Sequence, residues 1–148
     1  MSTIRFEWLA VVAVLVLAAS PRALAEGVGL VKVSTGTVYI ERAGKRLPAP
    51  IGTIVESADH IFTGRDGSAG ITFLDNSRLA LGPRSELAID RFNFDQTTHE
   101  GNFDSTLRHG TLSAVSGKLA KHSTKAMTVR TRSTVLAVRG TEFVLRTR

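Results

Sequence analysis

The sequence predicts an all-β domain, built as a short β-solenoid or β-helix-like stack of short strands. Apolar residues alternate with polar ones in short runs, as at Ala69, Ile71 and Phe73 and again at Leu79 and Leu81. This spacing can place all five on one core face of the strands. Turn residues recur roughly every 8–12 positions, a spacing typical of sandwiches, barrels and solenoids. After residue 25, no segment carries the i, i+3, i+4, i+7 apolar stripe of a long helix.

Residues 1–25 form a separate segment, which we predict to be a signal peptide helix that is removed on export. Arg5 lies in a short charged region, residues 9–19 are an unbroken apolar run, and Ala23-Leu24-Ala25 has the small-x-small form of a signal peptidase site. The run is about half of the ~20 residues that a membrane-spanning helix needs. An uncleaved N-terminal anchor is the alternative. Cleavage would leave one exported domain, residues 26–148, with no transmembrane segment.

The first part of this domain is expected to hold two strands and an edge segment. Residues 28–42 alternate on both sides of a break near Gly36. Pro48 and Pro50 disfavour a central strand, because proline cannot donate a hydrogen bond to a sheet. A short irregular turn is expected at residues 54–61.

Residues 59–81 are predicted to fold as strand, turn, strand, turn, strand. Asp66-Gly67 forms the first turn, and Asp75-Asn76-Ser77 forms the second, because Asn accepts a positive φ more easily than most residues. A weak echo of this stretch at residues 129–137 favours a solenoid over the other all-β architectures.

The remaining chain continues the same pattern. Residues 93–102 are polar and are expected to form a loop, residues 103–115 to form two strands broken at Gly110, and residues 116–125 to form a second loop. Short alternating runs predict the last strands, at residues 127–131, 135–137 and 143–145.

Positive charge gathers near the end of the chain. The net charge is +6, and the excess includes a set of five basic residues: Lys118, Lys121, Lys125, Arg130 and Arg132. These five, called the late basic residues below, suit either an anionic partner or a solvated strand face. Nucleic acid is not an expected partner for an exported protein, which leaves acidic glycans or lipid headgroups.

No catalytic, metal or cofactor signature is present. The histidines, at 60, 99, 109 and 122, have no metal-site spacing, and there is no cysteine to complete a site. The phosphate-loop pattern fails at Gly44-Lys45 and Gly117-Lys118, and no Gly-x-Ser-x-Gly elbow occurs. We therefore expect no enzymatic activity, no metal and no cofactor.

Two motif blocks stand out in the sequence. The first is Asp59-x-Ile61-x-Thr63-Gly64, followed by Gly67-Ser68-Ala69 and by Asp75-x-Ser77-x-Leu79-x-Leu81, and the second is Val138-Arg139-Gly140-Thr141-x-Phe143. These blocks resemble the FecR domain. Together they are fairly specific, and the resemblance covers most of residues 27–145. We interpret eight motif residues as structural, with turn chemistry first and ligand contact second: Thr63, Gly64, Gly67, Asp75, Ser77, Arg139, Gly140 and Thr141. Arg139 would hold neighbouring turns together through its guanidinium group.

The resemblance implies a small β-solenoid-like domain that faces the periplasm of a Gram-negative bacterium. The best-known members of this family regulate sigma factors through a cytoplasmic segment and a membrane span. This chain is expected to have neither, so it is more similar to stand-alone secreted FecR-domain proteins. Two functions stay open. One is a non-catalytic module that binds another envelope protein in signalling, and the other is an envelope structural or acidic-polymer-binding protein.

Overall fold

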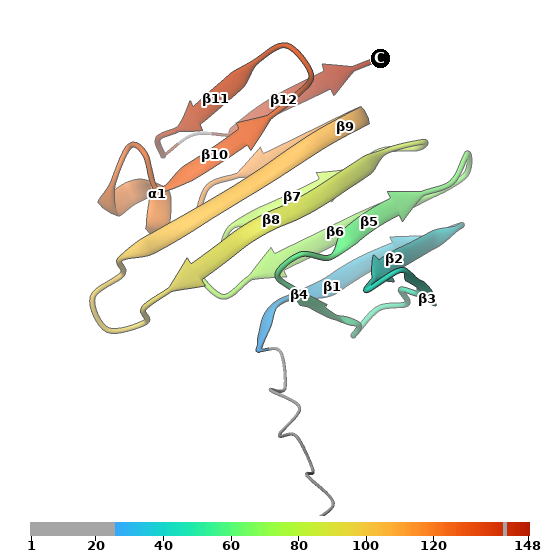
Figure 1. Cartoon of the computed structure of the whole chain (residues 1–148), viewed down its shortest axis with the longest axis horizontal. Coiled ribbons are helices and arrows are strands. Elements are labelled where there is room, and N and C mark those ends of the chain that lie inside the picture. Colours follow the sequence, from blue (N-terminus) through green and yellow to red (C-terminus); the bar gives the residue numbers. More distant parts are fainter. Residues whose placement is uncertain (1–25, 141) are drawn as a thin grey trace, which may run out of the picture.

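The computed structural model describes residues 26–140 and 142–148, in which twelve strands form one curled sheet with a single short helix beside it (Figure 1). The prediction of an all-β fold is therefore confirmed. The predicted signal peptide, residues 1–25, lies outside the described residues. Within the described part of the chain, no helix is long and apolar enough to cross a membrane. The elements are β1 (Gly27–Thr35), β2 (Val38–Arg42), β3 (Lys45–Pro48), β4 (Ile54–Glu56), β5 (His60–Thr63), β6 (Ser68–Phe73), β7 (Arg78–Leu81), β8 (Glu86–Phe94), β9 (Gly101–Val115), α1 (Lys118–His122), β10 (Met127–Arg130), β11 (Val135–Val138) and β12 (Glu142–Thr147).

The sheet has two halves that share strand β9. In one half the order is β4-β1-β6-β7-β9-β12, and in the other it is β3-β2-β5-β8-β9-β10-β11. The first part of β9 pairs with β8 and β10, and its second part pairs with β7 and β12. The chain also crosses between the halves at the β1–β2 and β5–β6 turns, so the two inner faces enclose one core.

The structure does not confirm the predicted β-solenoid. A solenoid stacks parallel strands, whereas here every strand pair among the described residues is antiparallel except β9 with β10. The reason lies in the short turns, which return the chain beside the strand it has just left. In the β6–β7 hairpin, for example, Asn76 takes a φ of 66° as its position in a tight turn requires.

Strand β9 runs through the predicted break at Gly110. The residue has a φ of 95°, and a Cβ atom at this position would lie 2.2 Å from Ser85 Oγ. Glycine thus lets the strand bend where it passes from one half of the sheet to the other. The two strands predicted for residues 103–115 are one bent strand of 15 residues.

The core is built from the predicted alternating face. Phe73 packs between Phe92 and Phe103, with ring centroids 5.5 and 4.5 Å apart. Each such buried apolar side chain contributes about 1.5–3 kcal/mol of transfer free energy. The five residues predicted to share this face are all buried, at 1–2% exposure: Ala69, Ile71, Phe73, Leu79 and Leu81.

Two of the loop predictions change. The predicted loop at residues 116–125 contains helix α1, because Leu119 and Ala120 are buried against the sheet and a single helical turn is too short to show periodicity. The expected irregular turn at residues 54–61 includes strand β4, which pairs with β1. By contrast, strand β3, which ends at Pro48, lies at the sheet margin as predicted.

Candidate functional site

Thr63 ties the end of β5 to the turn between β7 and β8. Its Oγ1 donates to the Gly82 carbonyl at 2.6 Å and accepts from the Ser85 N–H at 2.9 Å. Ser85 Oγ in turn accepts from the Thr111 N–H at 2.9 Å. Thr63 and Ser85 are both buried, so this hydroxyl network joins β5, the β7–β8 turn and β9 at one corner, called the Thr63 corner below.

Gly64 and Gly67 form the turn that leaves this corner. The Gly67 N–H donates to the Gly64 carbonyl at 3.0 Å. A Cβ atom at Gly67 would lie 2.3 Å from the Thr37 carbonyl oxygen, so only glycine fits against the β1–β2 turn. Between them, Asp66 accepts a hydrogen bond from the Thr37 N–H, which holds the pKa of its carboxyl below the usual value.

Asp75 and Ser77 are completely buried at the tip of the β6–β7 hairpin. Asp75 accepts from the Ser77 N–H and the Ser77 hydroxyl, at 3.0 and 2.6 Å. The segment before α1 closes the site, because the Gly117 N–H donates to Ser77 Oγ at 3.0 Å. These contacts are those of a turn anchored to a neighbouring segment.

The second motif block lies away from the Thr63 corner. Arg139 and Gly140 are exposed between β11 and β12, and Thr141 lies outside the described residues. Strand β12 begins beside Val115, close to the Asp75 hairpin, and its last residue, Thr147, pairs with Gly110 at the Thr63 corner. Strand β12 therefore runs from the Asp75 hairpin to the Thr63 corner.

The late basic residues do not form one compact patch. Lys118 and Lys121 lie on α1, where they line a shallow hollow with His99 and His122. Arg130 and Arg132 lie at the other end of β10, on the side of the β10–β11 turn. All five late basic residues are exposed.

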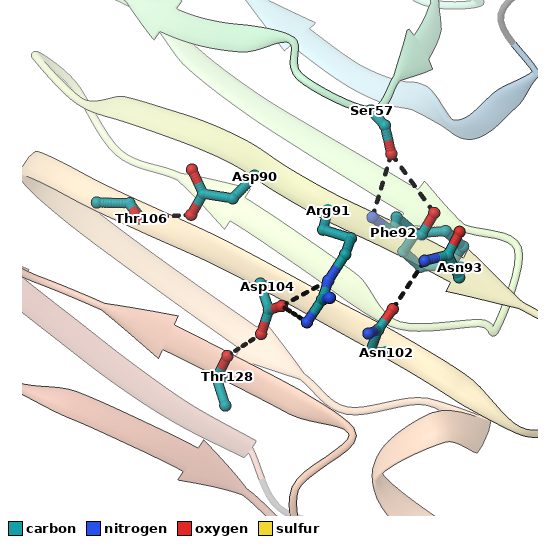
Figure 2. A network of polar contacts seen from close by, with 9 residues as sticks. All are labelled: Ser57, Asp90, Arg91, Phe92, Asn93, Asn102, Asp104, Thr106 and Thr128. Carbon is teal, nitrogen blue, oxygen red and sulfur yellow. Dashed lines mark hydrogen bonds and ion pairs between the residues drawn. The ribbon is translucent and has the colours of Figure 1, made fainter.

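A polar network covers the outer face of β8, β9 and β10 (Figure 2). Asp104 accepts hydrogen bonds from Arg91, at 2.6 Å, and from the Thr128 hydroxyl. Burial raises the pKa of Asp104, but these two partners outweigh it and hold the pKa below the usual value. Thr106 donates to Asp90 at 2.6 Å in the same way. Because these carboxylates pair with residues of the neighbouring strands, the network stabilises the sheet. Among the described residues, no group of three His, Asp or Glu side chains is placed to hold a metal ion.

One margin of the sheet is open. Strand β12 pairs only with β9, and β11 pairs only with β10, in the part of the chain that the structure describes. Both strands lie at the same margin in Figure 1. On their inner side Leu136, Phe143 and Leu145 are half-buried against the core, and on the outer side Val135 and Val144 are each 65% exposed. We call this the β11–β12 margin.

At the opposite margin the edge strands are β3 and β4, and the chain itself connects them. Residues 49–53 cross between the two halves of the sheet beside β1 and β2. The Gly52 N–H donates to the Val31 carbonyl at 2.9 Å, and the Ala49 N–H donates to the Val38 carbonyl at 3.1 Å. Ala49 is 1% exposed. Half-buried apolar side chains lie beside unpaired strand edges at the β11–β12 margin, whereas β3 is exposed along its whole length. This difference makes the β11–β12 margin the candidate interface.

The sequence indicates the two strands of this margin, but it does not show which of their edges are unpaired. The alternation at residues 143–145 indicated a strand, but it carries no information on how many neighbours that strand has.

Comparison with known proteins identifies the family. A family model described as FecR protein matches residues 59–148, which is about three-fifths of the chain and includes the Thr63 corner, the Asp75 hairpin and β12. Neither the search of curated proteins nor that of solved structures returned a significant match. The FecR family is generally regulatory rather than enzymatic, and it is associated with signalling in the bacterial envelope. Because the match spans more than half of its residues, this protein belongs to the FecR family.

Proposed function

We propose that this protein is a non-catalytic binding module of the bacterial envelope, periplasmic or secreted, which takes part in signalling by accepting an extended segment of another envelope protein. The observation that carries the proposal is the β11–β12 margin. There, half-buried apolar side chains lie beside the unpaired edge of β12. An added strand would supply the missing backbone partners and complete the burial of Phe143 and Leu145.

The charges of β12 indicate what the partner segment would look like. Glu142, Val144 and Arg146 are all exposed on one side of the strand. Opposite charges across a strand pair stabilise it, and like charges destabilise it. A partner strand would therefore place a basic residue near Glu142, an apolar residue near Val144 and an acidic residue near Arg146.

The acidic-polymer alternative has less support. It rests on the late basic residues, and these are divided between α1 and the far end of β10. Such separated charges give a diffuse positive field rather than a defined site.

Site-specific crosslinking in living cells tests the proposal. A photoreactive amino acid at position 144 should capture a discrete partner, which mass spectrometry would identify. The same amino acid at position 47, in the opposite edge strand β3, is the matched control, because Leu47 is also an exposed apolar residue. With the photoreactive amino acid at position 135, the change Val144→Asp should abolish capture while circular dichroism stays unchanged. Equal capture from positions 47 and 144, or no capture from 144 when the protein is exported and folded, would contradict the proposal.

A further inference from the structure

A cleft of about 680 Å³ lies at the Thr63 corner, at the end of the molecule where the β5–β6 turn, the β7–β8 turn and the end of β12 meet (Figure 1). No carboxylate side chain lines it. Its basic residues come from segments far apart in the sequence: Arg65, Arg84, His109, Arg146 and Arg148. We call it the arginine cleft, and the argument below rests on Arg65, Arg84 and Arg146.

The positive charge of the cleft is uncompensated. Among the described residues, none of these three arginines takes part in an ion pair. The nearest acidic group along β8 is Glu86, and it is already engaged by Arg108 at 3.0 Å and by His109 at 3.5 Å. Asp66, next to Arg65, accepts its hydrogen bond from the Thr37 backbone. Three arginines therefore line one cleft, and none of them has an ion-pair partner in the part of the chain that the structure describes.

The backbone holds Arg84 in place at some cost. Its φ of 51° lies in the left-handed region that favours glycine, yet an arginine stands there. The Gly82-Pro83-Arg84-Ser85 turn is fixed on both sides, because the Arg84 N–H donates to the Gly64 carbonyl at 2.9 Å and Ser85 is held by Thr63. A strained residue that the surrounding structure positions so firmly is typical of a binding site.

We propose that the arginine cleft binds a phosphomonoester group carried by a larger molecule. A phosphomonoester carries about 1.5–2 negative charges and three acceptor oxygens, so it can accept from several guanidinium forks at once. A single carboxylate has one charge and two oxygens, which one arginine satisfies. The cleft volume falls within the roughly 300–1,000 Å³ of small-molecule sites, so it has room for the sugar or lipid headgroup that bears the phosphate. This proposal does not depend on the partner strand proposed for β12.

Titration of the purified exported protein tests the proposal. We would follow backbone NMR signals while adding glucose 1-phosphate, and acetate in a parallel series at constant ionic strength. Saturable shifts should appear at residues 65, 84, 111 and 146, with at least about tenfold weaker binding of acetate. Co-sedimentation with phosphatidylcholine vesicles, with and without phosphatidate, distinguishes a phosphate on a lipid headgroup from a phosphate on a soluble sugar. Binding to the phosphatidate vesicles identifies the ligand as a lipid headgroup. Binding of glucose 1-phosphate without binding to the vesicles identifies it as a soluble phosphomonoester.

Two pairs of substitutions with equal loss of charge make the test specific. The double variant Arg84→Gly, Arg146→Gln should weaken glucose 1-phosphate binding by at least about tenfold. The control Lys121→Gln, Lys125→Gln removes the same charge from outside the cleft and should change binding less than twofold. Glycine suits the backbone at position 84, so the first variant should stay folded. Equal weakening by both pairs, equal affinity for acetate, or an absence of saturable binding to any of these phosphates would overturn the proposal.

Discussion

The Ser77 hydroxyl lies 2.6 Å from Asp75 Oδ2, and neither side chain has any exposed surface. The same hydroxyl accepts from the Gly117 N–H, so it connects the β6–β7 hairpin to the segment that leads into α1. A buried hydroxyl that both donates and accepts leaves two polar groups without partners when it is removed.

Ser77→Ala should therefore lower the free energy of unfolding by about 2–4 kcal/mol. Urea denaturation followed by circular dichroism measures this. Ser113→Ala is the matched control, because Ser113 lies in strand β9 on the outer face and is only half-buried, so its loss should cost less than about 0.5 kcal/mol. Similar losses for the two variants would show that the hairpin network contributes little.

The hairpin also illustrates what sequence alone could predict. Alternation located Ile71, Phe73 and Leu79 on a core face, and the positive φ tolerated by Asn76 located the turn, because both signals are local. The burial of Asp75 was not predictable, since it depends on Gly117, which is distant in the sequence. The antiparallel pairing that replaces the predicted solenoid, and the convergence of Arg65, Arg84 and Arg146, likewise depend on contacts between segments far apart along the chain.

Arg42 should contribute more to the stability of the fold than its position near a sheet margin suggests. Its guanidinium group binds both oxygens of Asp59, at 2.8 and 2.7 Å, and Asp59 is completely buried. This contact raises the pKa of Arg42, although burial of the guanidinium opposes the rise. Arg42→Ala leaves a buried carboxylate with only the Glu56 N–H as partner, and it should cost about 2–3 kcal/mol.

The matched control is Arg91→Ala. Arg91 also pairs with an aspartate, Asp104, but its side chain is 58% exposed, so the change should cost less than about 1 kcal/mol. Denaturant midpoints of the two variants, measured at pH 7, show which substitution lowers the stability more. If Arg91→Ala proves the more harmful, burial of the aspartate is not what makes an ion pair important here.

The pairing of Asp104 predicts a dependence of stability on acid pH. Its pKa in the folded protein is lowered, so it contributes stability above the unfolded value of about 3.9 and loses that contribution as the pH falls through the folded value. Between about pH 5 and pH 2, the wild-type protein should therefore lose more stability than Asp104→Asn does. Thermal unfolding across this range tests the prediction, and parallel curves for the two proteins would contradict it.

Substitution of a glycine by alanine can strain the backbone and can cause a steric clash of the new Cβ atom. Gly110 and Gly44 allow these two effects to be measured separately. Both glycines have a positive φ, of 95° and 74°, but a Cβ atom would strike Ser85 at Gly110 and meet nothing within 4 Å at Gly44. Gly44→Ala should cost about 1 kcal/mol from backbone strain alone. Gly110→Ala should cost at least about 3 kcal/mol, because β9 must shift away from the β7–β8 turn as well. Equal losses in urea denaturation would mean that the bend in β9 has room for a side chain.

Arg84→Gly should make the protein more stable and a weaker ligand binder at the same time. A left-handed conformation costs a residue with a side chain about 1–2 kcal/mol, and glycine removes this strain. Part of the resulting stabilisation is lost, because glycine makes the unfolded chain more flexible. A net stabilisation of about 0.5–1 kcal/mol is therefore expected, together with the loss of one guanidinium group from the arginine cleft. Paired measurements of the melting temperature and of glucose 1-phosphate affinity check both parts. Arg65→Gln is the control, because it removes a guanidinium group from the same cleft at a residue where φ is not positive, so it should weaken binding without raising stability. If Arg84→Gly gained stability and kept its affinity for glucose 1-phosphate, the strained conformation of Arg84 would not contribute to ligand binding in the cleft.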